Sequence, residues 1–298
     1  MKTVLCRGRF QKLSAHFPWY FFGLLPLLLT LCAVLLVPSV WTLIISFHDY
    51  RFGYPMHFVG FQNYKSLFQD PWFWHSVKVT ILFTICALSV EFIIGLALAL
   101  LLSRRFALQR VWIALLLSPY AISPVVAVAT WKYMLSYDGL VNYLLSLLGI
   151  SPVRWLSHPI LAFFALIIVD VWLNYPFIML IMYSAISSIP QEMFEAPLID
   201  GASGWQRFRY VFLPLLSPAI FVAITFRIIF ILRTFDIPWL MTQGGPIRAT
   251  EVLAIYLYRY GFRFWDFGMG SAVGWVMLLF TLLFSCGYIR AMYKKTVY

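Results

Sequence analysis

The chain contains six apolar stretches that are each long enough to cross a lipid bilayer. They cover residues 19–47, 77–102, 111–134, 160–184, 215–241 and 268–288. A helix needs about 20 mostly apolar residues to cross the hydrocarbon core. Backbone polar groups find no partners in lipid, and the stretches lack the alternation of barrel strands, so closed helices are expected. The predicted fold is therefore an all-α integral membrane protein with six transmembrane helices.

Composition agrees with this prediction. Of the 298 residues, 62% are hydrophobic and 11% are charged, whereas about a quarter of a soluble domain is charged. The formal net charge of +11 comes from short Lys and Arg clusters between the apolar stretches. No basic stripe with interleaved aromatic residues is present, so the expected partner is the bilayer and not a nucleic acid.

The positive charges predict the orientation. Segments 1–18, 103–110, 185–214 and 289–298 carry 12 Lys and Arg residues, whereas segments 48–76, 135–159 and 242–267 carry 6. Basic loops tend to remain in the cytoplasm, so the N- and C-termini are both predicted to be cytoplasmic.

The expected organisation is a cytoplasmic segment 1–18, a transmembrane domain 19–288 and a cytoplasmic tail 289–298. The first apolar stretch exceeds the core of a signal peptide, and no small-residue cleavage site follows it. We therefore expect it to be retained as a spanning helix.

The loop over residues 185–214 has an unusual pattern. Pro190 suits the first position of a short helix, and Gly201 suits its end. A second short helix is expected over 204–213. Apolar side chains on surface helices are covered either by lipid or by a soluble protein. A protein is favoured because the loop has few basic residues and carries three acids: Glu192, Glu195 and Asp200.

This loop resembles the EAA loop of binding-protein-dependent ABC importers. The resemblance lies in EAPLIDGA at 195–202, followed by Leu213 and Pro214. Further segments resemble the sugar branch typified by maltose and glycerol-3-phosphate permeases: FQNY at 61–64, DPWFW at 70–74, SPVV at 123–126 with Trp131, and MTQGGP at 241–246 with Thr250. One departure is Pro197 where the family has Ala, and a proline inside a helix would kink or restart it.

The resemblance implies the type I ABC importer permease fold, with a cytoplasmic coupling-helix loop between the fourth and fifth spans. A separate ABC ATPase subunit would dock there through Glu195, Ala196, Asp200, Gly201, Leu213 and Pro214. The implied assembly adds a second homologous permease subunit, a second ATPase copy and an extracytoplasmic solute-binding protein, in the bacterial cytoplasmic (inner) membrane.

No enzymatic activity is expected of the chain itself. It has no GxxxxGK phosphate-binding loop, so ATP and Mg would be used by the partner ATPase subunits and no cofactor would be bound by this chain. Neither a catalytic constellation nor a Cys and His spacing typical of a metal site is found.

Polar residues inside the spans are costly in lipid and mark either a translocation path or contacts between helices. The candidates are Glu91, Asp170, Asn174, Arg227, Arg233 and Asp236. Asp170 and Asn174 are four residues apart and share a helix face, whereas Arg233 and Asp236 are close enough in sequence to pair. Arg227 would either attract an anionic sugar or phosphate, or neutralise Glu91 or Asp170 on a neighbouring helix.

The predicted function is the transmembrane permease subunit of an ATP-driven importer for a sugar or related solute, such as an oligosaccharide, a polyol or glycerol phosphate. The alternative is a self-sufficient secondary transporter, but that class often shows an internal repeat, which is not found here. A second alternative is a membrane-embedded transferase. It would need clustered acidic and basic residues facing a lipid head group, and the loops of this chain contain too few acids.

Overall fold

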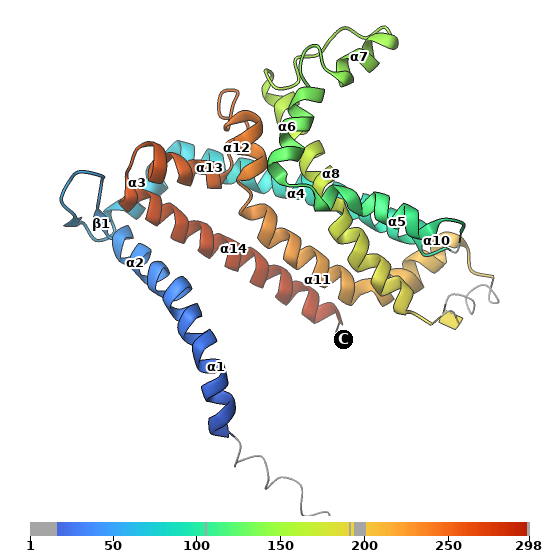
Figure 1. Ribbon diagram of the computed structural model, residues 1–298, viewed down its shortest axis with the longest axis horizontal. Helices are drawn as coiled ribbons and strands as arrows, with labels where there is room; N and C mark the ends of the chain where they lie inside the picture. Colours follow the sequence, from blue (N-terminus) through green and yellow to red (C-terminus); the bar gives the residue numbers. More distant parts are fainter. Residues whose placement is uncertain (1–16, 105, 191, 194–200, 297–298) are drawn as a thin grey trace, which may run out of the picture.

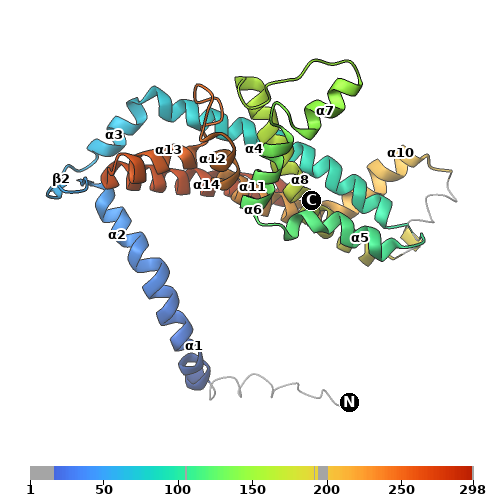
Figure 2. The same ribbon diagram turned by 45° about the horizontal axis from the view of Figure 1, so that its top comes forward.

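The computed structural model describes residues 17–104, 106–190, 192–193 and 201–296. Within this part of the chain the molecule is a bundle of long helices, with short helices gathered near α12 and α6 (Figure 1). The N-terminal helix leaves the bundle at an angle, and a second view confirms that it stands apart (Figure 2). The all-α prediction is confirmed.

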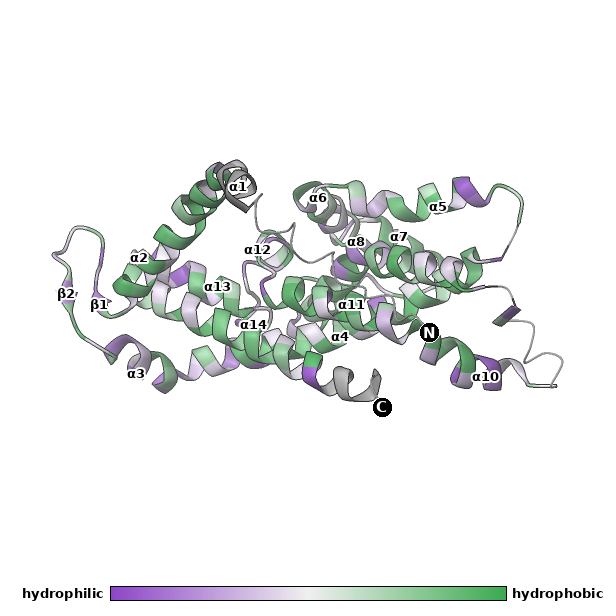
Figure 3. Ribbon diagram, turned by 90° about the horizontal axis from the view of Figure 1, so that it is seen from below, coloured by the Kyte–Doolittle hydropathy of each residue, from purple (hydrophilic) through white to green (hydrophobic). Residues whose placement is uncertain are grey.

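Five helices of the described residues are long and apolar enough to cross a membrane: Gly23–Ser46, Pro71–Leu102, Pro159–Ser188, Gly204–Leu232 and Phe267–Arg290. They are built from α1 (Phe17–Leu31), the π-helical η1 (Cys32–Leu36) and α2 (Val37–Ser46); α4 (Pro71–Leu102); α8 (Pro159–Ser188); α10 (Gly204–Arg207), the π-helical η3 (Phe208–Phe212) and α11 (Leu213–Leu232); and α14 (Phe267–Thr296). In Figure 3 these helices are mostly hydrophobic, whereas hydrophilic residues are more frequent in the connecting helix α3 and at the start of the span Gly204–Leu232, in α10.

The third predicted span is not a straight helix. Residues 111–134 form α5 (Gln109–Leu117), the 3₁₀ turn η2 (Ser118–Ala121) and α6 (Pro124–Met134), and the pair is bent by 95°. The break lies before Pro124. A proline disfavours helical dihedrals in the residue before it, and Ser123 has an extended ψ of 137°. Counted as one broken span, this pair brings the described spans to the predicted six.

The fifth span also differs from the prediction at both ends. Its helix ends at Leu232, short of the predicted 241, and α12 (Asp236–Thr242) follows as a separate element. Polar residues interrupt the apolar run between them. At the other end, the predicted separate helix over 204–213 is wrong, because that run continues into α11. Ser203 starts it with a capping box, accepting from the Gln206 amide at 3.3 Å.

Short elements complete the connections between the spans. They are β1 (His48–Asp49), β2 (His57–Phe58), α3 (Gln62–Gln69), α7 (Leu140–Leu147), α13 (Leu253–Tyr258) and η4 (Arg259–Arg263). The two strands pair antiparallel, with His48 opposite Phe58. Asp70 begins α4 by accepting a hydrogen bond from the Trp72 amide at 2.8 Å, with Pro71 at the first helical position.

The most extensive contact between helices of the described residues joins α4 to α8. Gly95 on α4 permits it, because a Cβ at this position would lie 2.9 Å from the Ile178 side chain of α8. One buried apolar cluster lies around this contact and includes Leu96, Ala99, Ile178, Met179 and Met182. This contact sets the separation of the helices that carry Glu91 and Asp170.

Candidate functional site

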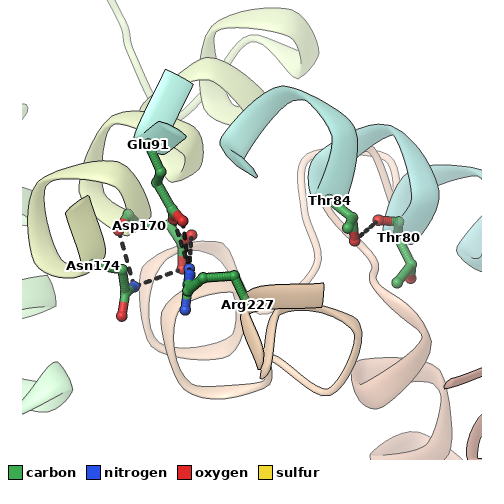
Figure 4. A network of polar contacts seen from close by, with 6 residues as sticks. All are labelled: Thr80, Thr84, Glu91, Asp170, Asn174 and Arg227. Carbon is green, nitrogen blue, oxygen red and sulfur yellow. Dashed lines mark hydrogen bonds and ion pairs between the residues drawn. The ribbon is translucent and has the colours of Figure 1, made fainter. Parts of the chain in front are cut away.

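A buried ion-pair cluster, called the central cluster below, joins the three spanning helices α4, α8 and α11 (Figure 4). Arg227 on α11 donates from Nε to Oε2 of Glu91 at 2.7 Å and from Nη2 to Oε1 at 2.6 Å. Its Nη2 also donates to Oδ2 of Asp170 at 3.2 Å. The side chains are nearly inaccessible, with exposed fractions of 6% for Arg227, 0% for Glu91 and 4% for Asp170. Such a fork-shaped pairing fixes both distance and orientation.

Asn174 completes the cluster from the same face of α8 as Asp170, as their spacing predicts. Its side-chain amide donates to the Asp170 carbonyl at 2.9 Å and to Oδ1 at 3.2 Å. Of the two roles predicted for Arg227, the structure contains the pairing with carboxylates of neighbouring helices. Removing one member of a buried ion pair leaves an uncompensated charge, which costs about 3–5 kcal/mol.

A cleft of about 440 Å³ opens beside this cluster. Five of the six polar residues predicted inside the spans line it: Asp170, Asn174, Arg227, Arg233 and Asp236. Glu91, the sixth, lies behind Arg227 and is fully buried. The structure thus brings all six candidates to one place.

The two helix breaks that the sequence analysis did not predict also meet at this cleft. Tyr120 and Pro124 line it from the break between α5 and α6, and Thr234 and Phe235 line it from the break between α11 and α12. Non-helical backbone at membrane depth is tolerated where it is buried in protein or faces a water-filled cavity. The breaks therefore mark the cleft as the polar interior of the bundle.

Arg233 and Asp236 do not pair with each other. Both are exposed, both line the cleft, and neither side chain has a hydrogen bond or ion pair among the described residues. The predicted pairing is wrong because the chain leaves the helix between them: Arg233 caps α11 and Asp236 begins α12. The unpaired guanidinium of Arg233 and the unpaired carboxylate of Asp236 thus line the same cleft.

Aromatic rings that the sequence analysis did not single out form much of the remaining lining. They are Tyr120, Phe177, Phe230 and Phe235. Tyr120 lies against Phe177, with ring centroids 6.3 Å apart. No sequence pattern distinguished these rings from the others in a chain that is 19% aromatic.

The predicted ATPase-docking loop is described only in part. Glu195, Ala196, Pro197 and Asp200 lie outside the described residues. Gly201 has a φ of +71°, as expected of a residue that ends a helix. Leu213 packs against the cluster of buried residues between α4 and α8, and Pro214 is exposed in the next position of the helix.

A second charged cluster holds the loop between α12 and α13. The side chain of Glu251 is fully covered, and its Oε2 lies 3.1 Å from Nη2 of Arg259 and 3.5 Å from Nε of Arg248. Burial raises the pKa of Glu251, although the two arginines act in the opposite direction. His75 of α4 fixes the same loop through the Arg248 carbonyl, with 2.9 Å between Nε2 and O.

Helix α13, which follows this loop, is tied to α4 and to the end of α3 by further polar contacts. Leu253 donates its amide to the Thr80 hydroxyl at 2.8 Å, and Tyr256 donates its hydroxyl to Oδ2 of Asp70 at 2.6 Å. Burial, together with Asp70, raises the pKa of Tyr256. Sequence reasoning missed Glu251. The available signal was an acid directly after Thr250, flanked on both sides by arginines in an otherwise aromatic loop.

A multi-pass bundle with a polar, break-lined cleft at its centre defines a membrane permease. Residues 16–290 match the family described as "Binding-protein-dependent transport system inner membrane component", and the chain belongs to this family.

Named relatives and a solved structure agree with this assignment. The trehalose/maltose transport system permease protein MalF of Thermococcus litoralis is 40% identical over 90% of this chain and 91% of that protein. The sulfoquinovosyl glycerol transport system permease protein SmoG of Agrobacterium fabrum is 36% identical over 82% of this chain and 79% of that protein. The fold matches a chain of the bacterial alginate ABC transporter solved with an alginate pentasaccharide-bound periplasmic protein. That match has a TM-score of 0.82 and 24% identity, over 93% of this chain and 95% of that chain.

Proposed function

We propose that this chain forms half of the transmembrane path of an ABC importer for a sugar, and that the central cleft is the part of the path in which the solute meets this subunit. The observation that carries the proposal is the meeting of five polar side chains and two helix breaks at one cleft inside the bundle. Polar residues in spans are expensive and cluster where a hydrophilic solute passes.

The solute class is supported by the relatives. MalF is named for trehalose and maltose, and SmoG for sulfoquinovosyl glycerol, so both act on carbohydrates or their derivatives. The cleft suits such a solute. Aromatic rings present apolar faces for the C–H face of a sugar ring, and Arg233, Asp236 and the Asn174 carbonyl offer hydrogen bonds to hydroxyl groups.

The proposed assembly contains this chain, a second homologous permease, two ABC ATPase subunits that use ATP and Mg, and an extracytoplasmic solute-binding protein. The alignment with an importer permease that was solved with a periplasmic protein supports this arrangement. The excess of basic residues in segments 1–18, 103–110, 185–214 and 289–298 supports cytoplasmic termini at the inner membrane.

The proposed coupling element is the loop over 185–214. Glu195, Ala196, Asp200 and Gly201 would contact an ATPase subunit, while Leu213 and Pro214 would join the loop to the fifth span. Because 204–213 continues into α11 as one helix, with the π-helical η3 inside it, a movement of the loop would be transmitted along this helix to Arg227. The ATPase cycle would in this way reach the central cleft.

The test is solute-stimulated ATP hydrolysis by the purified complex with its binding protein. The combined change Glu195→Ala and Gly201→Asp is expected to remove the stimulation, a loss of about 5- to 150-fold for a typical coupling free energy. Gly149→Asp is the matched control. Gly149 also has a positive φ, +76°, with no atom within 4 Å of an added Cβ, but it lies beside α7.

If the variant with both Glu195→Ala and Gly201→Asp kept its full solute-stimulated ATP hydrolysis, the coupling proposal would be refuted. Uptake of the solute into liposomes that hold this chain without an ATPase subunit would replace the importer with a secondary transporter.

A further inference from the structure

The positive charge in the central cleft is fully compensated. Arg227, its most buried cation, is held by two carboxylates, with N–O distances of 2.6 Å to Glu91 and 3.2 Å to Asp170. Its Nε and Nη2 already donate to these groups. An anionic solute that reached the remaining nitrogen, Nη1, would also lie close to two carboxylates, whose combined charge exceeds that of the guanidinium.

The remaining charges of the cleft cancel each other. Arg233 is exposed and unpaired, but Asp236 is also exposed and unpaired and lines the same space. Among the described residues of this region, two guanidinium groups, Arg227 and Arg233, face three carboxylates, Glu91, Asp170 and Asp236. No excess positive charge is left to attract an anion.

The uncharged part of the lining suits a neutral, hydroxyl-rich solute. Tyr120, Phe177 and Phe235 offer ring faces, and Asn174 keeps its side-chain carbonyl free because its two recorded hydrogen bonds use the amide nitrogen. Hydroxyl groups donate and accept, so they pair with Asp236 and Arg233 equally well, whereas a carboxylate, sulfonate or phosphate can only accept.

We infer that this cleft selects uncharged polyhydroxylated solutes against anionic sugars of the same size, with Asp236 as the specificity-determining residue. The inference rests on the proposed function, since it assumes that solute enters the cleft. Asp236 carries the selection because it is the one cleft carboxylate, among the described residues, that is free of an arginine or amide partner. Three carboxylates and two guanidinium groups leave a net charge of −1 in this region, and Asp236→Asn would remove it. At roughly 6 Å such a charge repels an anion by about tenfold in affinity, at dielectric constants between those of water and a protein surface.

The test is equilibrium dialysis of labelled solutes against the full membrane complex without the binding protein, so that selection by the binding protein does not contribute. The two probes are trehalose and a disaccharide of the same size with one glucuronate ring. The wild-type complex is expected to bind trehalose about tenfold more tightly than the acid. Asp236→Asn is expected to bring the two affinities to within about twofold of each other, by raising the affinity for the acid.

Asp138→Asn is the matched control, because Asp138 is also an exposed carboxylate but does not line the cleft. It should leave the ratio of the two affinities unchanged. Equal or tighter binding of the acid by the wild type, the same ratio in Asp236→Asn as in the wild type, or no saturable binding of trehalose would each overturn the inference. A wild-type complex that does not discriminate between the two probes but keeps solute-stimulated ATP hydrolysis would refute this inference alone, whereas absent stimulation would refute the proposed function.

Discussion

The central cluster holds one arginine, Arg227, between two carboxylates. The cluster of Arg248, Glu251 and Arg259, called the outer cluster below, holds one carboxylate between two arginines. The central cluster takes one residue from each of three spanning helices, α4, α8 and α11. The outer cluster takes Arg248, Glu251 and Arg259 from a single short stretch of chain. The first therefore fixes tertiary structure, and the second shapes a loop.

The two clusters also differ in how well their charges are satisfied. Arg227 makes three hydrogen bonds of 2.6–3.2 Å, and its side chain is 6% exposed. Neither carboxylate oxygen of Glu251 makes a hydrogen bond within the described residues, and its two arginines are 28% and 29% exposed. A buried charge gains from its partners only when the geometry is good. Substitutions in the central cluster should therefore lower the free energy of unfolding strongly, and substitutions in the outer cluster should lower it only slightly.

The strongest test of this difference is Arg227→Met, which removes the guanidinium but keeps a long apolar side chain. Glu91 and Asp170 would be left buried without a cation, and the expected loss of unfolding free energy is about 3–5 kcal/mol. Thermal unfolding of the purified complex measures it. The combined change Arg227→Met, Glu91→Gln and Asp170→Asn removes every charge and should recover most of the loss. An Arg227→Met protein as stable as the wild type would mean that the cluster holds no helices together.

Gly95→Val tests whether the central cluster depends on the contact between α4 and α8. Its Cβ would lie 2.9 Å from Ile178, so the helices must move apart, with an expected cost of about 1–3 kcal/mol. The same movement would pull Glu91 away from Arg227, and solute-stimulated ATP hydrolysis should fall with stability. Gly23→Val on α1 is the control, since nothing lies within 4 Å of its added Cβ. Equal effects of the two changes would contradict the assigned role of the contact.

The sequence predicted the spanning helices better than their breaks. The predicted spans 77–102, 160–184 and 268–288 lie within α4, α8 and α14, although α4 begins earlier, at Pro71, and α14 continues to Thr296. A continuous apolar run leaves few alternatives to a spanning helix. The same apolar runs concealed the breaks at Ser123 and Thr234. Pro124 and Arg233 were visible there, but Pro176 and Pro218 lie inside helices that continue, so a proline alone does not predict a break.

The candidate site was predictable as a set of residues but not as an arrangement. The free-energy cost of placing a polar side chain in lipid identifies all six candidates, and the spacing of Asp170 and Asn174 predicts that they share a helix face. Glu91 and Asp170 were predicted as alternative partners of Arg227, but nothing in a single sequence says that Arg227 pairs with both, or that Arg233 and Asp236 do not pair. Tyr120 and Phe235 were missed because an aromatic ring in a membrane chain most often anchors or packs.

The smallest expected effect belongs to Glu251→Gln in the outer cluster. The folded-state pKa of Glu251 lies above its usual value of 4.5, so the folded protein binds its proton more readily than the unfolded chain does. Its contribution to stability is therefore fully present below pH 4.5 and is lost as the pH rises through the raised value. Glutamine does not titrate, so the difference in stability between wild type and variant should fall with rising pH and then become constant. At neutral pH the change should stay below about 1 kcal/mol, because the carboxylate that it removes makes no hydrogen bond. Amide hydrogen exchange of residues 250–256, followed across this pH range, measures the effect on the loop itself. If the difference grew with pH, the two arginines would outweigh the burial of Glu251, and the outer cluster would resemble the central one after all.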